Sequence, residues 1–277
     1  MYKIRKDIFI NYCIKNESWL ESHLIPILKT NLHKEAILIE FRELEHLYFI
    51  IKNCIRVLGN DWSYTIVCGI NNYNFMYNIV KKINRNIKII KLDKENITRL
   101  QYSIMLLDSS FYKLFMGDNL LFYQEDTIIF RNIPLCYFKY DFIGSPIPNI
   151  KNSFNGGFSL RKKEIMIKIC EMYFDKLKIK FKKCIEFLEE KDKLLLDKNI
   201  NFKKDTKYLF LYLIEKSLLE DLLLTRYCNN LPSFNESLKF SVEKFYFNKP
   251  IGGHQFWYCV KNIELWLDIN LKKINYN

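Results

Sequence analysis

The chain has 277 residues, of which 49% are hydrophobic and 16% aromatic, so it has ample material for a core and disorder is excluded. Its formal net charge of +12 suits nucleic acid, an anionic membrane or a phosphorylated ligand, without choosing among them. The absence of any run of about 18 apolar residues excludes an ordinary transmembrane helix, and the absence of a CxxC pair excludes the usual zinc-ligand spacing.

The N-terminal segment, residues 1–17, mixes charged residues with short apolar patches. It lacks the continuous apolar core of a signal peptide, so we expect a cytoplasmic protein. The eight cysteines lie mostly inside apolar runs, which favours buried free thiols over disulfides in a reducing compartment.

Strands and helices are predicted to alternate over the first half of the chain. Short apolar, β-prone runs predict buried parallel strands at residues 36–41, 64–68, 87–92 and 119–123. Helical spacing between them predicts helices at residues 44–58, 73–83 and 97–116. This alternation is typical of an α/β fold with a Rossmann-type, mostly parallel sheet flanked by helices. Ligands bind such sheets beyond the carboxyl ends of the strands, so the residues that follow the strands are candidate site residues.

After residue 123 the alternation stops. The expected elements are short strands and loops at 124–160, a helix at 161–174, a lysine-rich insertion at 176–205, a helical region at 208–227, a strand at 239–243 and a helix near 257–269. With no repeat and no linker visible, we predict a single domain over residues 1–277, with its core at about 34–260.

The fourth predicted strand is followed directly by Gln124, Glu125 and Asp126. A carboxylate there could ligate a hard divalent cation and leave open positions for substrate phosphates. An ordinary acidic turn at the end of a strand explains the pattern as well.

Two adjacent glycines stand in the motif Asn155–Arg161 (NGGFSLR). Glycines let the backbone approach a ligand that a Cβ would block. A tight turn explains the glycines equally well, but it explains the flanking Asn155 and Arg161 less well.

Residues Ser217–Glu220 fit a capping box, which would place Asp221 in the first turn of a helix. A carboxylate held there is suited to accept a proton from an attacking hydroxyl. The alternative is that Ser217 lies within a helix and that Glu220 and Asp221 form a solvated edge.

Two glycines also precede His254, which indicates either a close approach to a ligand or a plain loop.

In this order the motifs resemble those of GT-A-fold glycosyltransferases, which share a DxD metal motif, a glycine loop, an xED motif and a late histidine. The chain looks most similar to a little-characterised GT-A-like family of fungi, bacteria and large DNA viruses, over roughly residues 34–260. The motifs that carry the resemblance are Glu40–Arg42 (E-x-R), Gln124–Asp126 (Q-x-D), Asn155–Arg161, Glu220–Asp221, Phe240–Glu243 (FSVE) and Gly252–His254 (G-x-H).

The resemblance implies a metal-dependent, inverting glycosyltransferase that moves a sugar from a nucleotide-diphosphate sugar, expected to be a UDP-sugar, to a hydroxyl of a glycan, a glycoprotein or another acceptor. Asp126 and His254 would hold Mn²⁺ or Mg²⁺, Asp221 would be the general base, and Glu220 would orient the acceptor. The residues expected near the nucleotide are Glu40, Arg42, Cys68, Gly69, Gln124, Glu125 and Lys249. Those expected to line the sugar and acceptor side are Asn155, Gly156, Gly157, Phe158 and Arg161. A viral source would place the protein in the host cytoplasm or the virion.

Gln124 departs from the family pattern because it replaces the first aspartate of the metal motif. One anionic ligand is therefore missing. Either Glu125 compensates, or metal affinity is lower, or the metal is held mainly by Asp126, His254 and the diphosphate. The remaining alternatives are a metal-independent enzyme and an inactive pseudoenzyme. The 18 Tyr and 22 Phe would also suit single-stranded nucleic acid, but their core-like spacing disfavours a nucleic-acid partner. A nucleotidyltransferase would need a glycine-rich basic loop after the first strand, where this chain has Glu40–Leu44 (EFREL).

Overall fold

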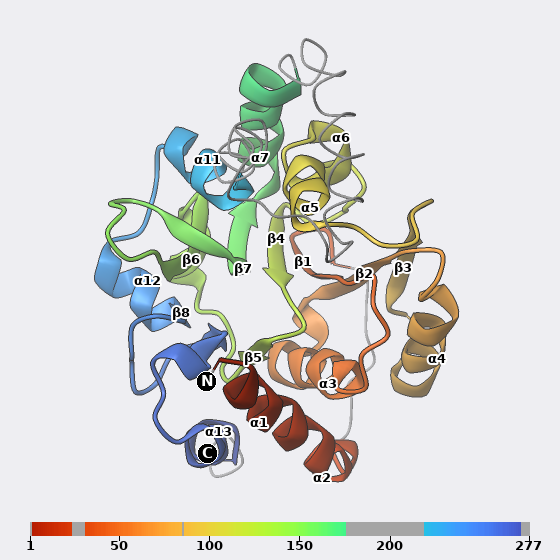
Figure 1. Cartoon of the computed structure of the whole chain (residues 1–277). Coiled ribbons are helices and arrows are strands. Elements are labelled where there is room, and N and C mark those ends of the chain that lie inside the picture. The colour runs from red at the N-terminus through yellow and green to blue at the C-terminus, as the bar shows by residue number, and fades with distance from the viewer. Residues whose placement is uncertain (1, 24–30, 85, 176–218, 273–277) are drawn as a thin grey trace, which may run out of the picture.

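The computed structural model describes residues 2–23, 31–84, 86–175 and 219–272. Its largest element is a six-stranded sheet with the order β3-β2-β1-β4-β7-β6 and helices on both faces (Figure 1). The predicted insertion at 176–205 and the start of the predicted helix at 208–227 lie outside the described residues.

The parallel half of the sheet consists of the four predicted strands. They are β1 (Lys34–Ile39), β2 (Ser63–Cys68), β3 (Lys88–Lys91) and β4 (Asn119–Tyr123). Successive residues of β1 pack on opposite faces: Ala36 and Leu38 in one core cluster, Ile37 and Ile39 in the other. Burial on both faces explains why the strand reads as an unbroken apolar run. Two strands complete the sheet in antiparallel orientation, β6 (Phe142–Pro146) and β7 (Phe154–Lys162). The predicted mostly parallel α/β fold is confirmed.

Two layers of helices cover the sheet. The cluster that contains Leu38 also receives side chains from α1 (Tyr2–Lys15), α2 (Glu17–Glu21), α3 (Leu47–Leu58), α4 (Tyr73–Ile83) and α13 (Ile263–Lys272). The cluster that contains Ile37 receives side chains from α5 (Arg99–Leu106), α6 (Ser109–Tyr112), α7 (Lys163–Ile169) and α11 (Glu220–Tyr227). The predicted helices over 44–58 and 73–83 correspond to α3 and α4.

The limits or the type of three predicted elements were wrong. The helix expected over residues 97–116 is divided into α5 and α6, because Asp108 ends the first unit and caps the second by accepting from the Ser110 N–H. The helix expected from Arg161 begins only at Lys163, because β7 runs on through Lys162. The strand expected over 239–243 is mostly α12 (Phe234–Phe240), followed by the short strand β8 (Ser241–Val242). A capping box between Ser233 and Glu236 starts α12.

The N-terminal helices α1 and α2 were not predicted. Charged residues such as Lys3 and Arg5 interrupt the apolar pattern of α1. The buried ring of Phe9 nevertheless contacts Phe256 and Trp257, so α1 packs beside the C-terminal part of the chain (Figure 1).

A second, three-stranded sheet has the order β5-β9-β8, with β5 (Thr127–Ile129) and β9 (Gly252–His254) antiparallel and β8 and β9 parallel. Its register pairs Thr127 with His254 and Val242 with Gly253. Segments more than 100 positions apart in sequence therefore meet beyond the end of β4. Among the helices of the described ranges, none is both long and apolar enough to span a bilayer.

Candidate active site

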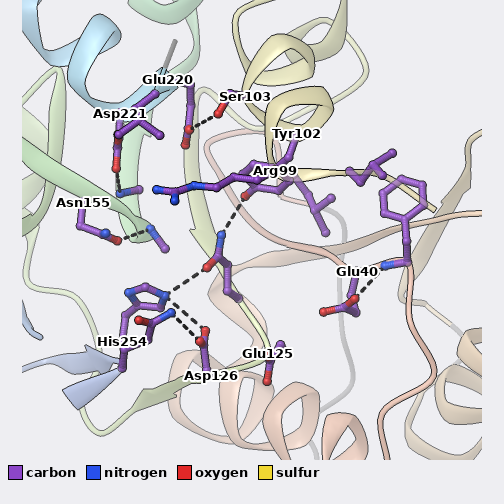
Figure 2. Close-up of a pocket in the computed structure, with 18 of the residues that line it drawn as sticks. Glu40, Arg99, Tyr102, Ser103, Glu125, Asp126, Asn155, Glu220, Asp221 and His254 are labelled. Atoms are coloured by element: carbon purple, nitrogen blue, oxygen red, sulfur yellow. Dashed lines mark hydrogen bonds and ion pairs between the residues drawn. The ribbon is translucent and has the colours of Figure 1, made fainter. Parts of the chain in front are cut away.

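A cleft of about 670 Å³ lies beyond the carboxyl ends of β1 and β4. The antiparallel pairing of β7 with β4 brings the two glycines of β7 to the same edge. The predicted site residues that line the cleft are Glu40, Arg42, Gln124, Glu125, Asp126, Asn155, Gly156, Gly157, Glu220, Asp221 and His254. Figure 2 shows Asp126 with His254 at one end of the cleft and Glu220 with Asp221 at the other.

Three polar atoms converge at the first end of the cleft. The Nε2 atom of His254 lies 3.2 Å from Asp126 Oδ1 and 3.0 Å from Gln124 Oε1. The other oxygen of Asp126 accepts a hydrogen bond of 2.8 Å from the side chain of Gln255, which has a left-handed backbone (φ 47°). Gln255 thus fixes the Asp126 carboxylate with Oδ1 turned toward His254.

The charges at this end are strongly coupled. Burial alone would lower the pKa of His254, but the Asp126 carboxylate raises it to about 10. Burial alone would raise the pKa of Asp126, but His254 lowers it to about 2. Without a metal ion, a protonated imidazole therefore neutralises the buried carboxylate.

Asp126, His254 and Gln124 together suit a divalent cation that takes its remaining ligands from a substrate. Asp126 Oδ1 is buried and accepts no hydrogen bond among the described residues; its contact is the ion pair with His254, which a bound cation would replace. The described ranges contain no group of three His, Cys, Asp or Glu side chains placed to hold a metal. The protein would thus supply a carboxylate, an imidazole and the amide oxygen of Gln124, and the phosphates of a substrate would complete the coordination, as is common for Mg²⁺.

Glu125 is engaged elsewhere and does not replace the missing anionic ligand. Its buried carboxylate pairs with Lys6 and accepts a hydrogen bond of 2.9 Å from His46 Nε2, with Arg42 3.4 Å away. Burial alone would raise the pKa of Glu125, but the bonds from His46 and Lys6 lower it. Lys6 comes from α1, so the N-terminal helix forms part of the cleft.

The carboxylates at the second end lie in the first turn of α11. Asp221 accepts backbone hydrogen bonds from Gly156 (3.1 Å) and Leu222 (2.8 Å), one on each oxygen. Glu220 accepts from Ser103 (3.3 Å) and lies 3.6 Å from the guanidinium of Arg161. Burial and the charge of Asp221 raise the pKa of Glu220 to about 7, and burial also raises the pKa of Asp221.

Asp221 lies in the first turn of a helix, as predicted. Ser217 lies outside the described residues, so the capping box predicted from it stays a prediction. The residue before the helix is Leu219, which makes no side-chain capping bond. Glu220 is buried, so the alternative of a solvated edge is wrong for this residue.

Arg161 lies behind the cleft and not in its wall. Its guanidinium is fully buried between the rings of Phe122 and Phe142, at 4.6 and 4.7 Å from their centroids. It also bonds to Tyr112 (3.2 Å) and to the Gly156 carbonyl (3.4 Å). Arg161 therefore supports Glu220 and the glycine strand from the protein side.

Four other predicted residues do not line the cleft. Phe158 is buried and stacks on Phe240 at 5.0 Å, because its side chain faces the core side of β7. Gly69 is a packing glycine: a Cβ there would lie 2.4 Å from the Lys94 carbonyl oxygen. Cys68 is buried in the core and Lys249 is exposed outside the cleft.

The two glycines of β7 line the cleft and make room for protein side chains. That they also allow a close approach of a ligand stays a prediction. A Cβ on Gly157 would lie 2.4 Å from His254 Nε2. A Cβ on Gly156 would lie 2.7 Å from both Arg161 Nη2 and Glu220 Oε1. Each glycine thus allows one end of the cleft to assemble.

These contacts predict separate defects. Gly157→Ala is expected to displace His254 and to weaken Mn²⁺ binding by about tenfold or more. Gly156→Ala is expected to shift Glu220 and Asp221 and to lower turnover by about 10²-fold, with Mn²⁺ affinity kept. Titration with Mn²⁺ and initial rates measure the two effects, and each variant is the control for the other. Identical losses in both variants would contradict this division of roles.

Several residues in the cleft were not predicted as site residues: Lys6, Arg99, Tyr102, Ser103, Glu243 and Gln255. Arg99 begins α5 and extends toward Asp221 (Figure 2), where its charge opposes the rise in the pKa of Asp221. The capping pair Thr98 and Gln101 was a readable signal for this helix start, whereas nothing local marks Lys6.

Comparison with known proteins identifies a family. Residues 86–254 match the family described as "Protein of unknown function (DUF5672)". The chain belongs to this family. The matched region runs from β3 to β9 and includes both ends of the cleft, but not Glu40 or Arg42. No curated protein matches the chain.

Two solved structures are similar in part. The mannosyltransferase PcManGT from Pyrobaculum calidifontis, in complex with GDP-mannose and Mn²⁺, is 6% identical, with a TM-score of 0.38, over 61% of this chain and 57% of that chain. The chain thus spans less than two thirds of that protein. The 4-diphosphocytidyl-2C-methyl-D-erythritol synthase from Anaerococcus prevotii is 10% identical, with a TM-score of 0.35, over 65% and 82% of the two chains.

Proposed function

We propose that the protein is a GT-A-type glycosyltransferase that moves a sugar from a nucleotide-diphosphate sugar, a UDP-sugar in our assignment, to an acceptor hydroxyl. The observation that carries the proposal is the division of one cleft into two ends. Asp126, His254 and Gln124 form a site for a cation at one end, and a pair of carboxylates lies at the other. Breaking a glycosyl–phosphate bond by direct displacement needs these two functions on opposite sides of the sugar.

The balance of charge in the cleft supports a cation. Six carboxylates line it, those of Glu40, Glu125, Asp126, Glu220, Asp221 and Glu243. The only Lys or Arg side chains among its described lining residues are those of Lys6, Arg42 and Arg99. A diphosphate would meet net negative charge there, so its binding favours a divalent ion between it and Asp126. The same excess of carboxylates disfavours a nucleic-acid backbone as the ligand.

Asp221 is the general base in this proposal. Both of its oxygens are held by backbone N–H groups, which orient the carboxylate. The pKa of Glu220 is raised to about 7, so this residue is partly protonated near neutral pH. Asp221 is then the carboxylate of the pair that stays ionised. Its contacts with Arg161 and Ser103 suit it to orient the acceptor side of the cleft.

The reaction is a single displacement. Asp221 accepts the proton of the acceptor hydroxyl, the hydroxyl oxygen bonds to the anomeric carbon, and the bond from that carbon to the phosphate oxygen breaks. The bonding electrons leave with the nucleoside diphosphate, and the anomeric configuration inverts. A bound Mn²⁺ or Mg²⁺ would neutralise the charge that develops on this leaving group.

The nucleotide is assigned to the end of β1. The Glu40 carboxylate holds the guanidinium of Arg42 through two bonds of 2.7 Å, and half of the Arg42 side chain remains exposed to the cleft. Asn72 donates to the Glu40 carbonyl oxygen at 2.9 Å and fixes this segment. Arg42 is thereby preorganised to contact the nucleotide.

The test is a thermal-shift screen of UDP, GDP, CDP and their sugars, with Mn²⁺ and with EDTA. One nucleotide class should raise the melting temperature strongly in Mn²⁺ and little in EDTA, since a ligand at 100 times its Kd stabilises the fold by about 2.7 kcal/mol. A nucleoside without phosphates and a single-stranded oligonucleotide are the controls. Equal shifts in Mn²⁺ and EDTA, or a shift with the oligonucleotide alone, would contradict the proposal.

A further inference from the structure

One ring nitrogen of His254 has no hydrogen bond. Its Nδ1 atom is buried and forms none with the residues that the structure describes, although Nε2 faces Asp126 and Gln124. The carboxylate in reach of Nδ1 is that of Glu243, whose Oε2 lies 3.7 Å away. His254 is 3% exposed and Glu243 is 7% exposed, so water does not readily replace this contact.

The small sheet places these groups around the imidazole. Strands β8 and β9 are parallel and Val242 pairs with Gly253, so the next residues, Glu243 and His254, lie side by side. On the other side of β9, His254 pairs with Thr127, which directly follows Asp126. One strand therefore presents Asp126 to Nε2, and the other presents Glu243 to Nδ1.

We propose that Glu243 is a positioning residue that accepts a hydrogen bond from His254 Nδ1 and thereby directs the Nε2 lone pair at the cation. The inference rests on the proposed function, because it concerns the metal end of the same cleft. A histidine binds a metal through an unprotonated nitrogen, so the one remaining ring proton must lie on Nδ1. A buried N–H needs an acceptor, and metal-bound histidines usually find one in a carboxylate or carbonyl oxygen.

Glu243 is free to take this role. Within the described ranges its carboxylate accepts no hydrogen bond, and its ionic contact there is the one with His254 Nδ1 at 3.7 Å. A movement of about 1 Å would bring the pair to an ordinary N–H···O length of about 2.9 Å. Gln255 has the matching function for Asp126, because its amide holds Oδ2 and leaves Oδ1 free.

The experiment compares Mn²⁺ affinities in the presence of UDP, using the electron paramagnetic resonance signal of free Mn²⁺. Glu243→Leu removes the acceptor, whereas Glu243→Gln keeps an acceptor oxygen without the charge. Glu264→Gln, an exposed glutamate of α13, is the control for loss of one negative charge. We expect Mn²⁺ to bind 10- to 100-fold more weakly to Glu243→Leu, less weakly to Glu243→Gln, and normally to Glu264→Gln.

Melting temperature and UDP affinity in EDTA separate positioning from folding, because a merely structural role would lower both in parallel with Mn²⁺ affinity. If Glu243→Leu does not fold, the isosteric Glu243→Gln variant still provides the measurement. Mn²⁺ affinities within twofold of the wild type in each folded Glu243 variant would overturn the inference and leave the proposed function standing. Failure of the wild type itself to bind Mn²⁺ with UDP would overturn both.

Discussion

Asp221→Asn is expected to lower turnover by about 10²-fold or more while leaving the affinity for the nucleotide sugar nearly unchanged. Asparagine keeps the size of the side chain and one acceptor oxygen for the backbone N–H groups, but it does not take a proton near neutral pH. Initial rates over a range of donor concentrations separate kcat from KM. Near-normal turnover in Asp221→Asn would mean that the base lies elsewhere, and the inverting mechanism would be withdrawn.

The activity of the wild-type protein should depend on pH through the protonation of Asp221. Burial raises the pKa of Asp221, so wild-type activity should fall as pH decreases through that raised value and the base becomes protonated. Glu220, with its pKa raised to about 7, becomes protonated before Asp221 as the pH falls, so Glu220→Gln should leave the acid limb nearly in place. In Asp221→Asn the limb should vanish. An acid limb that persists in Asp221→Asn would assign it to another group.

Asp126→Ala and His254→Ala are each expected to abolish the Mn²⁺-dependent part of nucleotide stabilisation. The double variant should lose no more than either single variant, because all three lose the same bound ion. Thermal shifts with nucleotide, measured in Mn²⁺ and in EDTA, check this. Asp118→Ala, which changes an exposed aspartate, is the control. Full additivity, or a Mn²⁺-dependent shift that survives in Asp126→Ala, would contradict a shared cation.

The appropriate readout is the difference between the thermal shifts measured in Mn²⁺ and in EDTA, because both substitutions also change the stability of the metal-free protein. His254→Ala leaves the buried Asp126 carboxylate without its positive partner, so the melting temperature in EDTA should fall. The metal-dependent increment is measured against each variant's own baseline.

The parallel half of the sheet could be predicted from the sequence alone. Strands such as β1 are buried on both faces and read as apolar runs, and their carboxyl ends pointed to Glu40 and Asp126. The limits of α5 and β7 were harder to predict, since Asp108 acts as a local cap and Arg161 has a buried site that only the folded chain creates.

Roles that depend on distant contacts could not be read from local patterns. From the sequence, Glu125 was one candidate to replace the missing anionic metal ligand, whereas the structure pairs it with Lys6, 119 positions away. The sequence predicted that a ligand approaches the backbone at the glycines of β7, and the structure shows protein side chains close to both. What approaches them, His254 and Glu220, follows only from the tertiary structure.

The most direct test of the central claim identifies which bond of the donor is broken. The wild-type protein is incubated with Mn²⁺ and the nucleotide sugar that stabilises it most, with water and simple glycosides as acceptors, and the products are followed by ³¹P nuclear magnetic resonance. We predict release of the nucleoside diphosphate, with loss of that product in Asp221→Asn. Formation of sugar 1-phosphate instead, with or without added pyrophosphate, would show cleavage within the diphosphate and would contradict glycosyl transfer.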